Sequence, residues 1–322
     1  MSFDQPLSPA EHRRTWWVAA GAIAVTYFYF LIFAEFALLE VVSPFAGSHL
    51  NAVLATLGVG GLVGAVLGAR IPLPEQRHLT LAWALRGCAL GAGLAYLAAN
   101  APMAYASAAI SGLSLGLLTV TLAASLAGAT QGRHLGLCVG IGTGLAYAAC
   151  NVPVLYHAAP QTQALVAAIA AFAMSLALPA SLSTPGLERT GSDFNSTGVA
   201  RWVAIFLALV WMDSAAFYII QHSSSLRAVA WSSTGTLYAN GLVHLVAALI
   251  AGVLIDRKQR TAIVATAATL LAIASLMLGG WLPSFVAPSL LYAAGVSLYS
   301  VALVEYPSRS GRPGTAALVY AL

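Results

Sequence analysis

The chain has 322 residues, of which 60% are hydrophobic and 7% are charged. A soluble domain carries charge on about a quarter of its residues, so this composition excludes a soluble protein and indicates a polytopic membrane protein. The net charge of +4 is spread over short loops. That distribution is typical of topology determinants, and we expect a lipid bilayer and no nucleic acid as a partner.

Apolar runs long enough to span a bilayer, which takes about 20 residues, follow one another along the chain. Ten complete spans are predicted, at residues 15–41, 50–70, 79–99, 102–128, 135–156, 161–182, 201–221, 237–255, 261–282 and 285–305. An eleventh run begins near Thr315 and stops at Leu322, so we expect the chain as given to lack its natural C-terminal end. The three cysteines lie within apolar runs without paired spacing, which favours buried, inert thiols over metal or redox roles.

The basic residues predict the orientation of these spans. With the N-terminus in the cytoplasm, all Arg and Lys residues except Arg86 and Arg227 fall on cytoplasmic loops or helix ends. The opposite orientation would violate the positive-inside bias. We therefore predict an integral, multi-pass protein of a bacterial inner membrane with a cytoplasmic N-terminus.

The two halves of the chain resemble each other. An offset of 187 residues places Gly61–Arg70 on Ala248–Arg257, with Ala69 where the later copy has Asp256. A polar, Ser- and Gly-rich connection separates the copies. We interpret residues 1–183 as an N-terminal six-helix bundle, 184–199 as a cytoplasmic linker and 200–322 as an incomplete C-terminal bundle.

A second symmetry is suggested within the first half by glycines repeated every four residues. They lie in the cytoplasmic halves of the second and fifth spans, at Gly60, Gly64, Gly68, Gly136, Gly140 and Gly144. Such stripes let neighbouring helix backbones approach closely. Matching stripes on antiparallel helices favour a three-plus-three inverted repeat, although ordinary helix packing is the alternative.

Two charged segments carry a resemblance to a known family. Gly252–Arg260 (GVLIDRKQR) and Glu305–Arg312 (EYPSRSGR) are similar to motifs of the major facilitator superfamily, the second as an acidic-proline-basic turn after the tenth span. The resemblance implies two six-helix bundles with inverted repeats, twelve helices when complete, and transport by alternating access. The corresponding turn after the second span departs from the family pattern at Ala69 and Pro72.

The resemblance also implies a cytoplasmic gate at these segments. Charged side chains there would pair with neighbouring helix ends in one state and release them in the other; the alternative is that they only set topology. The residues concerned are Asp256, Arg257, Arg260, Glu305 and Arg309.

Asp213 is the strongest candidate for proton coupling. An ionisable residue within a span is a functional hypothesis by default, because its burial in hydrocarbon is unfavourable. Asp213 lies twelve residues beyond Arg201, or about 18 Å along a helix, close to the middle of a core about 30 Å thick. A purely structural hydrogen bond or ion pair is the alternative.

Further polar and aromatic residues are candidates for the wall of a central cavity, with packing as the alternative for each. Glu35 is interpreted as an outer proton relay or an interfacial carboxylate, and Asn151 lies beside a predicted kink at Pro153. His244 and Asn240 share one helix face, but without companion ligands they do not indicate a metal site. The remaining candidates are Thr26, Tyr27, Tyr29, Tyr147 and Trp211.

The sequence therefore predicts a secondary active transporter that moves a small organic solute, coupled to protons, and acts as a monomer. No enzyme, phosphate-binding or haem-attachment motif is present in the sequence, so we expect no enzymatic activity and no cofactor. The absence of a midplane arginine disfavours a strongly anionic solute. The alternative is a non-transporting membrane subunit or assembly factor with the same fold.

Overall fold

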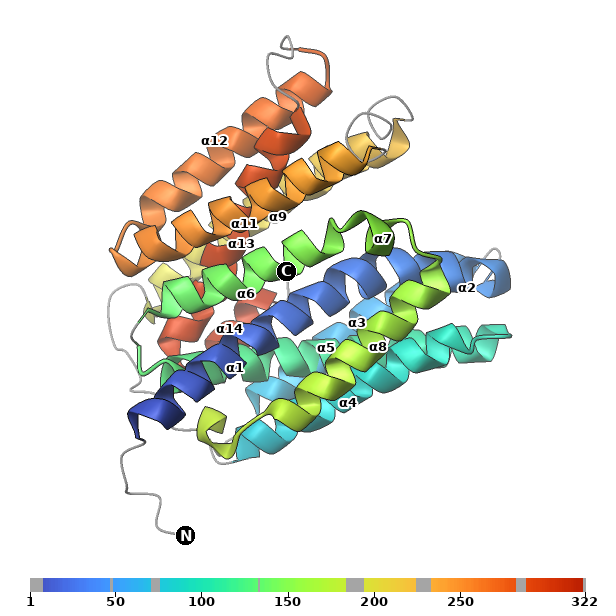
Figure 1. The fold of residues 1–322 in the computed structure, drawn as a ribbon, viewed down its shortest axis with the longest axis horizontal. Coiled ribbons are helices and arrows are strands. Elements are labelled where there is room, and N and C mark those ends of the chain that lie inside the picture. The colour runs from blue at the N-terminus through green and yellow to red at the C-terminus, as the bar shows by residue number, and fades with distance from the viewer. Residues whose placement is uncertain are drawn as a thin grey trace.

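The computed structural model shows a protein built from helices (Figure 1). It describes residues 8–46, 49–70, 76–132, 134–183, 194–223, 233–281 and 288–320. No strand occurs within these ranges, and the predicted all-α class is confirmed.

The first half of the chain contributes a series of helices joined by short connections. They are α1 (Pro9–Phe28), the π-helical segment η1 (Tyr29–Ala37), α2 (Leu38–Ala46), α3 (Leu50–Ala69), α4 (Arg77–Tyr96), α5 (Ala101–Ala129), α6 (Leu135–Cys150), α7 (Pro153–Tyr156), α8 (Pro160–Ala177) and the short 3-10 turn η4 (Ala180–Ser183). Because α1, η1 and α2 are continuous, they form one apolar span over Pro9–Phe45.

The second half adds α9 (Ser196–His222), α11 (Thr234–Asp256), α12 (Arg260–Leu278), α13 (Pro288–Ser310) and α14 (Pro313–Tyr320). Within the described ranges, nine helical spans are long and apolar enough to cross a membrane, and α6 is a shorter apolar helix of 16 residues. The predicted succession of membrane helices is therefore present, with its fifth member shorter than expected.

Prolines end two helices earlier than the apolar runs suggested. Val152 is extended (φ −69°, ψ 120°) and separates α6 from α7, because Pro153 follows it. Leu178, which precedes Pro179, has the same extended backbone and ends α8. The break that the sequence predicted at Pro153 is thus observed.

The secondary structure of the segment Glu305–Arg309 differs from the prediction. It was predicted as a turn after the tenth span, but it lies within α13, which continues to Ser310. Pro307 is accommodated inside the helix, and the hydroxyl of Ser308 donates to the Val304 carbonyl at 2.6 Å. The helix ends at Gly311, whose φ of +65° is readily adopted only by glycine.

The helices form two groups (Figure 1). Helices α9, α11, α12 and α13 lie together in the upper part of the view, whereas α1, α3, α4, α5 and α8 form the lower part. Helix α6 packs against both α1 and α11, and α14, although late in the chain, packs against α3 and α5. Segments distant in sequence therefore meet along the boundary between the groups.

The predicted division at residues 184–199 stays a prediction. Residues 184–193 lie outside the described ranges. Helix α9 begins at Ser196, with the Asn195 side chain accepting from the Gly198 amide, so the last four residues of the expected linker are helical.

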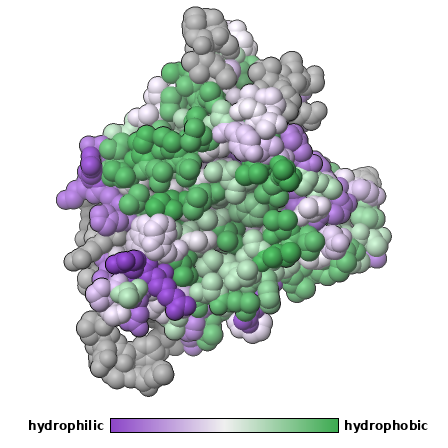
Figure 2. Space-filling view, in the orientation of Figure 1, coloured by the Kyte–Doolittle hydropathy of each residue, from purple (hydrophilic) through white to green (hydrophobic). Residues whose placement is uncertain are grey.

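The outward face of the protein is apolar, as a bilayer requires. Figure 2 shows hydrophobic residues spread across the visible helices, with hydrophilic residues gathered mainly toward the left and right margins. Large apolar side chains are exposed on this outer surface, among them Trp83, Val154, Leu176 and Leu242. In a soluble protein such exposure would be unfavourable, so these side chains are suited to contact with lipid.

The two glycine stripes pack against different partners. On α3, the Gly64 backbone lies directly against Leu113 and Leu117 of α5, within the first group. On α6, Gly136 lies against Gly252 and Gly140 against Ala248 of α11, across the boundary between the groups. The second stripe therefore brings the two halves of the chain into backbone contact.

Candidate functional site

A cavity of about 870 Å³ lies between the two groups of helices. Helices from both halves of the chain line it, including α1, η1, α3, α5, α6, α9, α11 and α13. Three carboxylates are on its wall, from Glu35, Glu40 and Asp213, and none of the described residues that line it is Lys or Arg. The cavity is thus acidic and, through its many tyrosine and phenylalanine side chains, aromatic.

Asp213 is held at the cavity wall by two tyrosines of α13. The hydroxyl of Tyr292 donates to Oδ1 of Asp213 at 2.5 Å, and the hydroxyl of Tyr299 donates to Oδ2. The two tyrosines are seven residues apart, which is two helical turns, so they reach the carboxylate from the same face of α13. The aspartate is half-buried and lines the cavity, as the sequence predicted.

Glu35 also lines the cavity, from the π-helical segment η1 of the first half. Local π-helices are rare and occur frequently at functional sites. A contact between Phe36 and Phe217, with ring centroids 5.5 Å apart, joins η1 to α9 one turn beyond Asp213. Glu35 is half-buried and has no hydrogen-bond or ion-pair partner among the described residues, whereas Glu40, nearer the rim, is exposed.

A hydrogen-bonded aromatic group connects the two halves across the cavity. The Tyr27 hydroxyl donates to the carbonyl of Ser300 at 3.4 Å, and the Tyr147 hydroxyl is 3.2 Å from the Ser300 hydroxyl. The Tyr147 ring stacks on His244, with centroids 4.3 Å apart and planes 3° apart. His244 Nδ1 is in turn 2.7 Å from the hydroxyl of Ser297.

The remaining predicted polar residues also reach the cavity, although two are engaged by their own helices. Asn151 donates from its side-chain amide to the carbonyl of Tyr147 at 2.9 Å, and Thr26 donates to that of Ala22 at 2.7 Å. Asn240 is buried on the same face of α11 as His244, one turn away, and both line the cavity.

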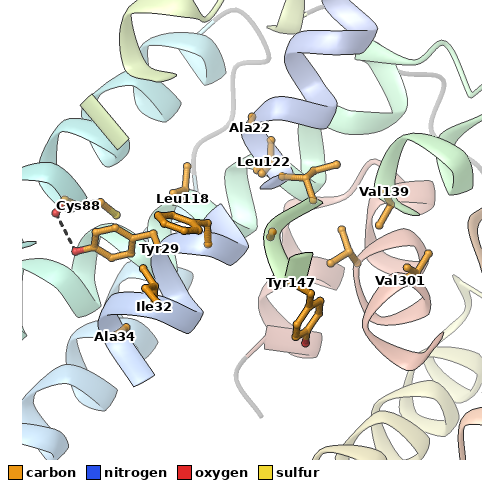
Figure 3. Packing of buried hydrophobic residues seen from close by; sticks show 14 of the residues in the cluster. Ala22, Tyr29, Ile32, Ala34, Cys88, Leu118, Leu122, Val139, Tyr147 and Val301 are labelled. Atoms are coloured by element: carbon orange, nitrogen blue, oxygen red, sulfur yellow. Dashed lines mark hydrogen bonds between the residues drawn. The ribbon is translucent and has the colours of Figure 1, made fainter. Parts of the chain in front are cut away.

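Two predicted cavity residues lie elsewhere. Trp211 is 70% exposed on the outer surface, because a residue two positions from Asp213 is turned about 200° around the helix. Tyr29 is buried within the first group, where its hydroxyl donates to the Cys88 carbonyl at 2.8 Å and lies 3.1 Å from the Ser111 hydroxyl. Figure 3 shows Tyr29 pointing toward Cys88. The cavity assignment of both residues was wrong.

The contribution of α13 to the cavity was not predicted from the sequence. Its small and aromatic residues recur every three or four positions on the cavity side, at Ser289, Tyr292, Ala293, Val296, Tyr299, Ser300 and Leu303. Residues with this spacing lie on one face of a helix, and the pattern could have indicated a cavity-lining helix. The pairing of its two tyrosines with Asp213 spans 79 and 86 residues of sequence, which no local pattern reports.

Beyond the inner end of the cavity, Asp256 joins the end of α11 to the beginning of α6. Its two carboxylate oxygens accept from the backbone amides of Gly136 and Leu137 at 2.8 and 2.9 Å. Amides in the first turn of a helix have no partner within the helix, and the helix dipole favours a negative charge there. One side chain of the second half thus caps a helix of the first half.

Glu305 is the centre of an ion-pair cluster beside this cap. Its carboxylate is fully buried and accepts from Arg260 at 2.8 and 3.3 Å and from Arg309. Arg309 also lies 3.8 Å from Asp256. We refer to Asp256, Arg260, Glu305 and Arg309 as the gate.

Arg257 was predicted to belong to the gate, but its place is different. It is exposed at the end of α11 and makes no ion pair with another described residue. Arg260 instead lies over the rings of Trp202 and Tyr306, at 5.5 and 5.4 Å from their centroids. Arg257, which follows the end of α11, is thus exposed to solvent, whereas Arg260, which begins α12, points inward.

The comparisons with known proteins agree with this architecture. The crystal structure of the human organic anion transporter MFSD10 (TETRAN) aligns over 98% of this chain and 91% of its own, at 18% identity and a TM-score of 0.62. The major facilitator superfamily proton:xylose symporter XylE aligns over 98% of this chain and 86% of its own, at 14% identity and a TM-score of 0.66. The chain has the major facilitator fold.

The similarity is one of structure and not of sequence. The scan against protein-family models and the search of curated proteins found no match. The predicted fold is confirmed by the structural neighbours, and the residues of the site have to be argued from their own geometry.

Proposed function

We propose that the protein is a secondary active transporter that moves a small organic solute by alternating access. A single observation carries this proposal: a large cavity lies between two helical groups, and at the gate the Asp256 carboxylate of the second half accepts hydrogen bonds from two backbone amides of α6 in the first half. None of the four gate residues lines the cavity, whereas Glu40 at its other end is exposed. A cavity closed at one end only is the arrangement that alternating access requires.

The positive-inside pattern assigns the gate end to the cytoplasm, so the described state is outward-facing in this proposal. The structural neighbours support a transporter, because one moves organic anions and the other xylose together with protons. They do not indicate this chain's solute, since the same fold serves different chemistries and the site decides between them.

Asp213 is the proposed proton-coupling residue. It is a carboxylate within a membrane-spanning helix, it faces the cavity, and two tyrosine hydroxyls of α13 hold it. The other titratable groups on the same cavity are Glu35, Glu40, His244, Cys150 and the tyrosines. A rearrangement of α13 that separates the tyrosines from Asp213 would change its affinity for a proton, which links proton binding to conformation.

Transport by purified protein in liposomes tests the proposal. A trapped pH indicator would report proton movement when sugars, organic anions or organic cations are added outside. We expect one of these classes to drive proton movement in the wild type and in Trp211→Phe, which changes a lipid-facing residue of the same helix. We expect Asp213→Asn to reduce the coupled movement to the level of empty liposomes.

Two outcomes would contradict the proposal. Wild-type coupling in Asp213→Asn would remove this residue from the mechanism. Failure of every solute class to drive proton movement would favour the alternative, a membrane subunit that retained the fold without the cycle. The presence of Ala69 where the later copy has Asp256 also suggests this alternative.

A further inference from the structure

The charge of the cavity wall restricts the solute. Three carboxylates face the cavity, and no Lys or Arg does so among the described lining residues. The arginines that the structure places near the two-group boundary, Arg260 and Arg309, are paired with Glu305 at the gate. An anion entering this cavity would therefore meet negative charge without a positive partner, which is unfavourable at low dielectric.

The two inner carboxylates are in different states. Asp213 is occupied by two tyrosine hydroxyls. Glu35 faces the same space without a hydrogen-bond or ion-pair partner among the described residues, and the contact between Phe36 and Phe217, with ring centroids 5.5 Å apart, brings its helical segment beside α9, which carries Asp213. A carboxylate within a membrane span is unfavourable without a partner, so its natural complement is a ligand that supplies positive charge.

The rest of the wall suits an apolar cation. Aromatic side chains line the same cavity as the two carboxylates, among them Tyr27, Phe36, Tyr147, Phe217, Tyr292 and Tyr299. The faces of such rings attract cations, and the attraction is larger where water is excluded. A volume of about 870 Å³ is within the range of pockets for multi-ring molecules.

Resting on the transport function proposed above, we infer that the solute is an apolar organic cation, whose charged centre binds between Glu35 and Asp213 and whose apolar groups contact the surrounding aromatic side chains. The hydrogen bonds from Tyr292 and Tyr299 hold the Asp213 carboxylate at the wall, so Glu35 is the ion-pairing partner that the cation reaches first. Asp213 contributes the second negative charge.

Equilibrium binding of radiolabelled tetraphenylphosphonium to the purified protein in detergent tests the inference. We expect saturable binding of the label. Phenyltrimethylammonium should displace it at concentrations at least about tenfold lower than those at which its neutral isostere tert-butylbenzene does, because a single ion pair in a buried site changes the affinity by a factor of that order. Benzoate, an anion of similar size, should not displace the label.

Variants separate charge from folding. Glu35→Gln and Asp213→Asn should each weaken binding by about tenfold or more, whereas Glu35→Asp, which keeps the charge, should lose less than Glu35→Gln. Trp211→Phe, on the lipid-facing side of α9, should bind within about twofold of the wild type. Absence of saturable tetraphenylphosphonium binding, equal displacement by tert-butylbenzene, or wild-type affinity in Glu35→Gln would overturn the inference.

Binding in detergent does not need a transport cycle, so the two proposals can fail separately. Saturable cation binding without flux of tetraphenylphosphonium into liposomes would contradict transport but not the ligand class. Proton-coupled flux of a sugar or an organic anion, without tetraphenylphosphonium binding, would contradict only the ligand class.

Discussion

Tyr27 and Tyr29 are two positions apart on the first span, and their hydroxyls serve different parts of the molecule. Tyr27 faces the cavity and reaches Ser300 of the second half. Tyr29 faces the interior of the first group, where it bonds to Cys88 and Ser111. Residue type alone could not distinguish them, because the direction of a side chain depends on which helices surround it.

This difference predicts opposite effects of the same substitution. Tyr29→Phe should lower the free energy of unfolding by about 1–2 kcal/mol, because the buried Cys88 carbonyl loses its donor and the buried Ser111 hydroxyl loses a hydrogen-bond partner, and it should leave the tetraphenylphosphonium affinity unchanged. Tyr27→Phe should alter the affinity with a smaller effect on stability, since its bond to Ser300 is long at 3.4 Å. Unfolding titrations in mixed micelles and binding isotherms would measure both. A reversed pattern would place Tyr29, not Tyr27, at the cavity.

Glu305, the buried carboxylate of the gate, should be the residue whose substitution lowers the stability of the protein most. Glu305→Gln leaves Arg260 and Arg309 without their shared partner, and removing one member of a buried ion pair costs about 3–5 kcal/mol. We expect the lower end of that range, because the two arginine side chains keep 13% and 19% exposure. Thermal unfolding in detergent measures the loss.

Glu40→Gln is the matched control for this substitution. Glu40 is an exposed carboxylate without an ion pair among the described residues, so its replacement should change the free energy of unfolding by less than about 0.5 kcal/mol. Equal effects of the two substitutions would show that the Glu305 cluster contributes no specific stability.

At the scale of elements, sequence patterns predicted the helices better than their partners. The proline break after α6 follows from the chemistry of one residue, and the offset of 187 correctly relates the ends of α3 and α11, at Ala69 and Asp256. The glycine stripes were also visible, but not that one packs on α5 and the other on α11. A stripe specifies a close approach and leaves the identity of the neighbour open.

The contact between α6 and α11 predicts the effect of a larger residue. A β-carbon at Gly252 would lie 2.5 Å from the Gly136 carbonyl oxygen, so Gly252→Val should force the two helices apart beside the gate. Because Asp256 caps α6 one turn away, its hydrogen bonds to Gly136 and Leu137 should weaken as well. We expect a shift of the population toward an open gate.

Gly93→Ala provides the control for this shift. Gly93 is on α4 with no other atom within 4 Å of its added β-carbon, so the gate should be unaffected. Accessibility of a cysteine placed at Ser214, an exposed cavity residue, to an impermeant maleimide would report the state of the cavity. Equal labelling in the Gly252→Val and Gly93→Ala backgrounds would contradict a role for the α6–α11 contact in holding the gate closed.

At the scale of the whole molecule, hydropathy, basic residues and two short motifs were sufficient to predict the fold, because a bilayer leaves few alternatives to apolar helices. The candidate site was predicted only in part. Asp213, Glu35 and His244 were identified as ionisable residues in apolar spans, but the tyrosines that bind Asp213 come from α13, which carried no charged signal in its cavity half. Contacts between distant helices depend on their relative rotation, which composition and periodicity do not specify.

Alternating access predicts that the two ends of the molecule move in opposite senses. Helices α4 and α12 lie at opposite edges of the structure (Figure 1), so spin labels on them report the separation of the groups. Labels at Leu79 and Thr261 mark the gate end, and labels at Leu97 and Trp281 mark the cavity end, all at exposed side chains or helix starts. Asp256→Ala removes the hydrogen bonds from α6 to the end of α11 and should open the gate. The first distance should then lengthen and the second shorten, because rigid groups that rock about a central site exchange one opening for the other. Distance distributions from pulsed electron paramagnetic resonance measure both pairs in one reconstituted protein. If the gate-end distance increased while the cavity-end distance stayed fixed, the gate would open as a local rearrangement, and the two groups would not act as rocking bodies.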